Sequence, residues 1–409
     1  MKKFFQKQTI ALSITIFIFL AFSILLSSLA ISKAGQSNTQ YGNDFTVFYS
    51  AAKNLYYYAD PYNHPIAAKT PYLYLPLFSL LIVPLAIMPL AYAATVWYWL
   101  NILFTILLLV ISTRLVSNKL SEQTPILIIL FILLARLIID NLLWGQVNIL
   151  VALLISLWLL AQEKSYKWLG ELALAIAISI KITPVLLGFY LLIKGRWQEL
   201  KRLVISFLSI TFISLIPLGS NALPLLKGWF NRTILNKEGF NWAYAGNQSL
   251  RGALERLASA TNTESSYYPK VNLVDLSSKE VQQIFLLLAL FLVCYFSYKT
   301  IKQSNKLLVS QVAAICSLML LLSNLSWKAH FIFLTLPLAI LTKKSLYGQK
   351  PFSLIIGATL ILFFLITSLT TQPIIGPKLH QWFETHSYYC VITLVIFPLC
   401  LTTKDQQKL

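Results

Sequence analysis

Long apolar stretches, separated by short polar segments, recur along almost the whole chain. Each is long enough, or nearly long enough, to cross a bilayer as a helix, which needs about 20 apolar residues. They lie at about 9–32, 76–113, 124–140, 146–162, 168–193, 200–219, 281–299, 307–323, 326–341, 352–369 and 386–402. We expect 76–113 to form two passes broken at Pro89, because a proline interrupts a helix. The pattern therefore predicts an all-α polytopic membrane protein with about twelve transmembrane helices.

Two longer polar segments, 33–75 and 220–280, interrupt this pattern. In the first, DFTVFYSAAKNLYYY has apolar and aromatic residues at helical spacing, and DPYNHP then ends the helix. In the second, NWAYAGNQSLRGALERL is polar at first and then amphipathic, presenting Arg251, Glu255 and Arg256. Tyrosines such as Tyr56 to Tyr58 are typical of a membrane interface. We expect two outer loops with short interfacial helices, within a single membrane-embedded domain that spans 1–409.

Composition supports the membrane assignment and excludes a soluble domain. The chain is 57% hydrophobic and 11% charged, and its mean hydropathy is +0.70. The first apolar run ends in SKAG, which imitates a signal-peptidase site. Its apolar core is longer than that of an ordinary signal peptide, so we expect a retained first helix. The four cysteines have no short paired spacing and are interpreted as core residues.

The net charge of +19 comes from short basic segments rather than from a nucleic-acid-binding surface. Lys2, Lys3 and Lys7 precede the first apolar run, and further basic loops lie at 194–202, 299–306 and 343–350. Because basic loops favour the cytoplasmic side, both termini are predicted there and the two long loops outside. The same count places the basic segment 114–123 outside and the GQVN turn (Gly145 to Asn148) near the cytoplasm.

The carboxylates suggest a reaction with one general base. Only fourteen acidic residues occur, and none forms a DxD motif or a two-metal cluster. Whereas a glycosidase uses two facing carboxylates, an inverting sugar transferase needs a single base for the acceptor's proton. Asp44 suits this role because the surrounding aromatic residues could raise its pKa. The alternative is that Asp44 caps the helix that begins there.

Seven short motifs, in order, resemble the polyprenol-phosphate-mannose-dependent α-mannosyltransferases of family GT87, also called DUF2029. They are DFTVFYSA with DPY, YLYLPLFSLLIVPLAIMP, WYWLN, GQVN, KITP, NQSL and SNLSWKAH, between about 42 and 340. The resemblance implies a GT-C fold, with many helices, two outer loops over the site, and a lipid-linked sugar donor that enters from the bilayer.

The resemblance assigns roles to individual residues. It makes Asp44 the catalytic base and points to Trp327 and His330 in SNLSWKAH as donor contacts, although a lone histidine on an apolar helix is more often a core residue. Lys181 in KITP is the leading partner for the donor phosphate, because an intramembrane lysine is costly; snorkelling to the interface is the alternative. The further candidates for donor or acceptor are Tyr74, Gln146, Asn148, Asn247, Gln248, Arg251 and Arg256. Gln146 and Asn148 are equally suited to joining helices.

The sequence thus predicts a glycosyltransferase of the inner (plasma) membrane, acting at the extracytoplasmic face. It would move a hexose, mannose above all, from a polyprenyl-phosphate donor to a glycolipid or glycan acceptor. No cofactor, no metal site and no nucleic-acid partner are expected, and the question of a divalent ion stays open. A transporter or flippase of lipid-linked sugars is the main alternative, but the chain lacks the paired halves typical of transporters. A scaffold with a decayed site and a nucleotide-sugar enzyme fit less well.

Overall fold

The computed structural model describes residues 24, 25, 28, 32, 44–62, 72–164, 166–231, 233, 241–259, 269–301 and 307–402. Within these residues the chain is helical, with one isolated β-bridge between Ser259 and Leu276. The helices are α2 (Asp44–Tyr58), α3 (Pro76–Ala86), α4 (Leu90–Val116), α5 (Leu120–Trp144), α6 (Asn148–Glu163), α7 (Lys167–Ile180), α8 (Val185–Ile193), α9 (Trp197–Leu215), η2 (Ile216–Asn221), α10 (Ala222–Phe230), α11 (Leu250–Ala258), α12 (Ser278–Ile301), α13 (Val309–Leu322), η4 (Lys328–Leu334), α14 (Thr335–Tyr347), α15 (Phe352–Phe364), η5 (Leu365–Leu369), α16 (Gln372–Thr385) and α17 (Tyr388–Leu401).

Six helical segments among the described residues are long and apolar enough to cross a membrane. They are Leu90–Val116, Leu120–Trp144, Trp197–Phe230, Ser278–Ile301, Lys328–Tyr347 and Phe352–Leu369. A seventh span results if α16 and α17, which are bent by 54° relative to each other, are taken together. The prediction of an all-α polytopic membrane protein is therefore confirmed. The described residues support six or seven spans rather than twelve, and the predicted first helix, at about 9–32, lies outside them except for four positions.

The region 76–113 corrects the sequence prediction, because it does not contain two passes. The segment before Pro89 forms α3, which has 11 residues and is roughly 16 Å long at 1.5 Å per residue. That is about half the thickness of a bilayer core. The chain turns at 87–89, and α4 alone makes the long pass.

The region 168–193, expected as one pass, is also broken. α7 ends at Ile180, and α8 begins at Val185 after the bend at 181–184. Pro184 explains the break, since it lacks an N–H group and disfavours a helical residue before it. The break places Lys181 at the C-terminal end of α7 rather than within a helix.

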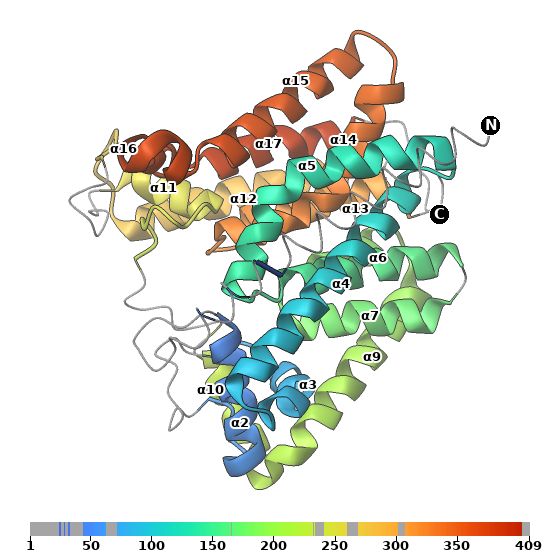
Figure 1. Cartoon of the computed structure of the whole chain (residues 1–409), viewed down its shortest axis with the longest axis vertical. Coiled ribbons are helices and arrows are strands. Elements are labelled where there is room, and N and C mark those ends of the chain that lie inside the picture. The colour runs from blue at the N-terminus through green and yellow to red at the C-terminus, as the bar shows by residue number, and fades with distance from the viewer. Residues whose placement is uncertain are drawn as a thin grey trace.

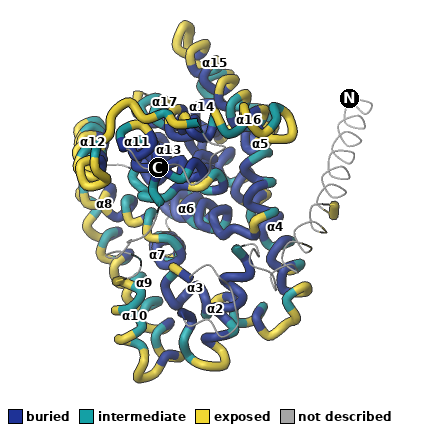
Figure 2. The backbone as a smooth tube through the Cα atoms, turned by 90° about the vertical axis from the view of Figure 1, so that its left-hand side faces the viewer, coloured by how far each residue is buried: buried dark blue, intermediate teal, exposed yellow. Residues whose placement is uncertain are grey.

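Burial divides the helices into central and peripheral ones. Figure 1 shows α14, α15 and α17 at one edge of the molecule and α2, α3, α9 and α10 at the other. Figure 2 shows that α6, α13 and much of α4 and α5 are buried, whereas α12 and α15 carry many exposed residues. In the most apolar window of Lys328–Tyr347, 72% of the residues are buried, against 17% in that of Ser278–Ile301. Many of the exposed residues on the peripheral helices are large and apolar, such as Leu287 and Phe291 of α12 and Leu354 and Ile361 of α15, as expected for a surface that faces lipid.

Basic residues gather at one end of the helix bundle. Lys343 Nζ donates to the carbonyl of Val116 at 2.6 Å, and Arg114 forms an ion pair with Glu163 at 3.1 Å. The segment around Arg114 thus lies beside the basic loop at Lys343, not at the opposite end as the count of passes predicted. The short α3 accounts for the difference, since one pass fewer reverses the direction of the helices that follow.

Candidate functional site

Asp44 is the first residue of α2, a helix held in place by aromatic packing. The ring of Phe45 stacks on that of Trp97 in α4 with centroids 5.7 Å apart, and Phe48 packs edge-on against Phe78 of α3 at 4.9 Å. The residues Phe45 to Leu55 are buried except Lys53. This packing fixes the start of α2, and with it the partly exposed Asp44, beside the start of α4.

A glycine turn brings the GQVN segment to Asp44. α5 ends at Trp144, and the next residue, Gly145, has a φ of 62°, a left-handed conformation that glycine adopts without strain. The indole N–H of Trp97 donates to the carbonyl of Gly145 at 2.9 Å. The next residue, Gln146, donates from Nε2 to Asp44 Oδ2. The GQVN turn therefore lies at the same end of the bundle as Asp44.

A chain of hydrogen bonds continues from Asp44 to Lys181. Asn148 Nδ2 donates to Gln146 Oε1 at 3.0 Å, and Lys181 Nζ donates to Asn148 Oδ1 at 2.5 Å. The charge of Asp44 also acts directly on Lys181. We call these four side chains, Asp44, Gln146, Asn148 and Lys181, the polar centre. It joins residues from α2, the α5–α6 turn, the start of α6 and the end of α7.

His330 and Tyr74 border the polar centre. Asp44 lies near enough for its charge to act on Tyr74, and Lys181 is similarly close to His330. The backbone N–H of Trp327 donates to His330 Nδ1 at 3.2 Å, which fixes that ring nitrogen as the acceptor. The Trp327 side chain is 39% exposed and packs on Tyr244 with centroids 5.6 Å apart. Both residues of SNLSWKAH therefore lie at this end of the bundle.

Asn141, which the sequence analysis did not single out, connects the polar centre to η4. Its Nδ2 donates to the carbonyl of Ala329 at 2.8 Å, and its Oδ1 accepts from Asn148 at 3.2 Å. Asn141 is fully buried. Its polar character within the apolar α5 is a signal in the sequence, because buried amides in membrane helices need partners.

The NQSL residues form a buried connection rather than an open polar surface. Asn247 Nδ2 donates to the carbonyl of Asn324 at 3.0 Å, and its Oδ1 accepts from the N–H of Ser326 at 3.1 Å. Gln248 Nε2 donates to the carbonyl of Glu384 at 2.8 Å. Asn247 and Gln248 have no exposed surface. Their hydrogen bonds hold the second long loop against the segments that precede η4 and α17.

The two arginines of α11 differ in their surroundings. Arg256 is buried and donates to the carbonyls of Thr385 and Tyr244 and to the hydroxyl of Ser387. Burial lowers its pKa to about 10. Arg251 lies over the ring of Trp242, 4.3 Å from its centroid, and 3.5 Å from Glu255. Both arginines are thus part of the packing of this loop, and neither contacts the polar centre.

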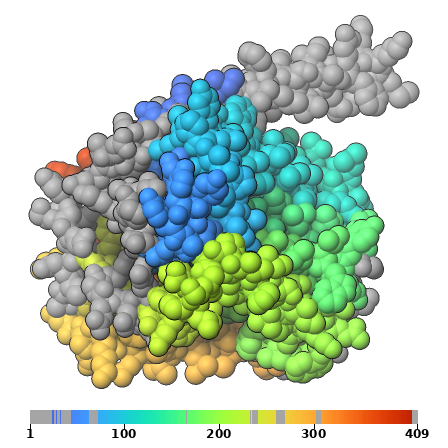
Figure 3. All heavy atoms as spheres, turned by 90° about the horizontal axis from the view of Figure 1, so that it is seen from below, coloured from blue at the N-terminus to red at the C-terminus, as the bar shows by residue number. Residues whose placement is uncertain are grey.

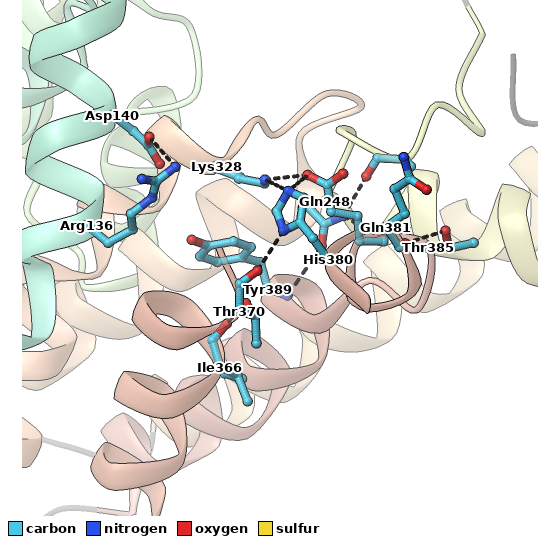
Figure 4. A network of polar contacts seen from close by, with 12 residues as sticks. Arg136, Asp140, Gln248, Lys328, Ile366, Thr370, His380, Gln381, Thr385 and Tyr389 are labelled. Atoms are coloured by element: carbon cyan, nitrogen blue, oxygen red, sulfur yellow. Dashed lines mark hydrogen bonds and ion pairs between the residues drawn. The ribbon is translucent and has the colours of Figure 1, made fainter. Parts of the chain in front are cut away.

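A second polar cluster, shown in Figure 4, was not predicted from the sequence. Lys328, at the start of η4, forms an ion pair with Glu384 of α16. His380 Nε2 lies 3.4 Å from Glu384 Oε1 and 3.2 Å from Lys328 Nζ, while His380 Nδ1 is 2.6 Å from the carbonyl of Thr370. We call Lys328, His380 and Glu384 the α16 clamp. It fastens α16 to the segment that carries Trp327 and His330.

The described residues contain no group of three or more His, Cys, Asp or Glu side chains placed to hold a metal ion. The chemistry available at the polar centre is that of one carboxylate, one ammonium group and neutral amides. A carboxylate can accept a proton, and an ammonium group can offset negative charge that develops on a neighbouring oxygen.

The all-helical fold with its apolar helices indicates an integral membrane protein, and the polar centre places a carboxylate and an ammonium group at one end of its bundle. A comparison with family models matches residues 72–324 to glycosyltransferase family 87. The match covers more than half of the chain, so the protein belongs to this family, which indicates a glycosyltransferase. Searches of curated proteins and of solved structures found no match. The matched region includes Gln146, Asn148 and Lys181, whereas Asp44 and His330 lie outside it.

Proposed function

We propose that the protein transfers a hexose, with mannose as the favoured sugar, from a polyprenyl-phosphate donor to a glycolipid or glycan acceptor. The observation that carries the proposal is the hydrogen-bonded chain from the Asp44 carboxylate to the Lys181 ammonium group. An inverting transfer requires a base for the acceptor and a positive group for the leaving phosphate. The polar centre offers both within one connected set of side chains.

In this mechanism the Asp44 carboxylate takes the proton of an acceptor hydroxyl while that oxygen attacks C1 of the donor hexose. The bond between C1 and the phosphate oxygen breaks, and the polyprenyl phosphate leaves with the electron pair. Lys181 offsets the charge that builds on the phosphate, and His330 lies near enough to assist. One displacement inverts C1, so a β-linked donor gives an α-linked product.

The distribution of basic residues supports a site at the extracytoplasmic face. Arg114 and Lys343 lie at the end of the bundle opposite Asp44, and Lys167 pairs with Glu199 at 3.5 Å in the same basic region. Because basic loops favour the cytoplasm, the polar centre would face outward from the inner membrane. The GQVN turn would then lie on the outer side together with Asp44, whereas the count of passes in the sequence had placed it near the cytoplasm.

The decisive experiment measures the transfer of radiolabelled mannose from synthetic polyprenyl-phosphate mannose to membrane glycolipids in nanodiscs. The Asp44→Asn variant should lower kcat by about 10² to 10⁴, the usual contribution of a general base. Asp60→Asn is a matched control, since Asp60 accepts the N–H of Tyr62 at 2.9 Å in the turn after α2. Equal activity of Asp44→Asn and the unmodified protein would remove Asp44 from this role. A protein that transfers no sugar but moves lipid-linked sugar across sealed vesicles would instead be a transporter.

A further inference from the structure

At the start of α9, three cationic side chains surround a single carboxylate oxygen. Glu199 Oε1 lies 2.6 Å from Arg196 Nη2 and 3.4 Å from Arg202 Nη2. These three residues follow one another at a spacing of three, so they share one side of the helix start. Lys167, the first residue of α7, approaches the same oxygen from the neighbouring helix, with its Nζ at 3.5 Å. We call Lys167, Arg196, Glu199 and Arg202 the basic cluster.

Two helices that begin side by side hold the basic cluster in place. α7 and α9 pack along each other, and both begin on the same side of the molecule (Figure 1). Figure 3 shows green residues of α7 next to yellow-green residues of α9. Before α9 the chain turns at Gly195, which has a φ of 63°, and the N–H of Arg196 donates to the carbonyl of Leu191 at 2.9 Å. Because a helix N-terminus carries a partial positive charge, the two helix starts add to the charge of the cations.

The charges of the basic cluster do not balance, since three cations face one carboxylate. Glu171 of α7 lies near enough to interact with Arg202 and Glu199, but it is fully buried and accepts a hydrogen bond from Gln162 Nε2 at 2.8 Å. Even if Glu171 is counted as ionised, an excess of positive charge remains. Nε and Nη2 of Arg202 are buried and have no hydrogen-bond partner among the described residues. A further anion would therefore offset part of the cost of burying this guanidinium group.

The residues around the basic cluster are those of a membrane interface. Trp168 and Trp197, each next to a cation in the sequence, are both exposed, and exposed tryptophans are typical of the boundary between lipid and water. Exposed apolar side chains follow on both helices, with Leu169 on α7 and Val204 and Ile205 on α9. Cations therefore lie at the height of lipid headgroups, directly beside a surface that suits acyl chains.

We propose that the basic cluster binds the phosphate of an anionic phospholipid from the leaflet at this end of the bundle. The side chains of Lys167, Arg196 and Arg202 are 40%, 28% and 16% exposed, so a phosphate can contact all three. Charge-assisted hydrogen bonds to its oxygens match the excess of positive charge, while the acyl chains lie on the apolar residues of α7 and α9. Glu199 holds the cations together and also competes with the lipid for them. The inference does not depend on sugar transfer.

The test measures lipid binding to the purified, delipidated protein by native mass spectrometry. The unmodified protein should retain dioleoyl phosphatidylglycerol in preference to zwitterionic dioleoyl phosphatidylcholine. Arg196→Gln combined with Arg202→Gln should weaken phosphatidylglycerol binding about thirtyfold, because each basic residue near an anionic lipid surface contributes roughly a factor of five. Lys201→Gln is the matched control and should bind like the unmodified protein. It removes an exposed charge from the same helix, and a residue two positions from Glu199 does not face it.

Glu199→Gln distinguishes a lipid site from a cluster with a structural role alone. Removing the competing carboxylate should strengthen phosphatidylglycerol binding about fivefold, the effect of one charge at such a surface, although it breaks the ion pairs. A cluster with a structural role alone would show no gain. If the double variant failed to fold, Glu199→Gln would decide the question by itself.

Three results would each overturn the inference. They are equal retention of the two lipids by the unmodified protein, undiminished phosphatidylglycerol binding in the double variant, and unchanged or weaker binding in Glu199→Gln. Displacement of phosphatidylglycerol by equimolar inorganic phosphate would show a site for free phosphate and would overturn the assignment to a lipid. Because no sugar donor is present in these measurements, their outcome leaves the proposed transferase activity to its own test.

Discussion

At the scale of single residues, the polar centre places two opposite charges at the ends of a short amide chain. Asp44 and Lys181 are connected through Gln146 and Asn148 rather than in direct contact. A direct ion pair would hold both charges against each other and reduce their availability to substrates. The two amides between them fix the positions of both charges and keep them apart. This arrangement agrees with Asp44 as the proposed base and Lys181 as the proposed contact of the donor phosphate.

Replacing Lys181 tests whether its charge stabilises the leaving phosphate. We expect Lys181→Gln to lower kcat by about 10² to 10³, the range for loss of one electrostatic contact in a transition state, because glutamine can keep a hydrogen bond to Asn148 but carries no charge. Lys181→Arg should recover part of the loss. Steady-state kinetics with saturating donor would measure both.

The control is Lys343→Gln, which removes a lysine bonded to a carbonyl at the opposite end of the bundle and should leave kcat unchanged. If Lys181→Gln raised KM alone, the lysine would bind substrate and transition state equally. The assignment to the leaving phosphate would then be withdrawn.

At the scale of elements, the α5–α6 turn depends on one glycine. Gly145→Ala places a side chain at a φ of 62°, and we expect about 1 to 2 kcal/mol of destabilisation from the left-handed conformation. Because Gln146 would shift with the turn, transfer activity should fall as well. Thermal unfolding in detergent measures the destabilisation, and the mannose-transfer assay measures the loss of activity.

The comparison variant is Gly228→Ala, in α10, where an added Cβ meets nothing within 4 Å. It should be neutral or slightly stabilising, since alanine favours helices over glycine by about 1 kcal/mol. Similar melting temperatures for both variants would show that the left-handed turn contributes no measurable stability.

For the α16 clamp we expect a loss of stability. In Glu384→Gln, Lys328 loses the carboxylate of a largely buried ion pair, which typically costs 3 to 5 kcal/mol. The double variant Lys328→Met with Glu384→Gln should be more stable than the single one, because no unpaired charge is left. A double-mutant cycle of unfolding free energies measures this coupling.

The pair of Lys119 and Glu122, 3.2 Å apart, provides the control, because the Lys119 side chain is 76% exposed. Lys119→Ala should cost less than about 1 kcal/mol. Additive losses of unfolding free energy in the Lys328 and Glu384 cycle would contradict the clamp, because the two side chains would then lie close together without stabilising each other.

Local motifs predicted more of the site than of the helix arrangement. DFTVFYSA contributes Asp44, GQVN contributes Gln146 and Asn148, and KITP contributes Lys181 to the polar centre. The required side-chain chemistry is visible in a few adjacent residues of each motif. The α16 clamp joins Lys328 to Glu384 across 56 positions in the sequence, and no local pattern indicates that pairing. Hydropathy likewise does not distinguish the 11-residue α3 from half of a longer pass, since both are equally apolar.

At the scale of the whole molecule, the two ends of the bundle differ in chemistry. One end holds the polar centre, the NQSL residues and the α16 clamp, and the other holds the basic segments at Arg114 and Lys343. This separation agrees with the proposed function, in which the basic end would face the cytoplasm and the end with the polar centre would carry out the transfer.

This polarity predicts which side of the membrane each end occupies. In a Cys294→Ser background, which removes the exposed native cysteine, Leu273→Cys should react with an impermeant maleimide in intact cells, because Leu273 is 82% exposed near α11. Lys119→Cys should react only after permeabilisation, since its side chain is 76% exposed at the basic end. The other three cysteines are buried and should contribute little background. The reverse pattern would place the polar centre in the cytoplasm, where a donor presented at the outer face could not reach it.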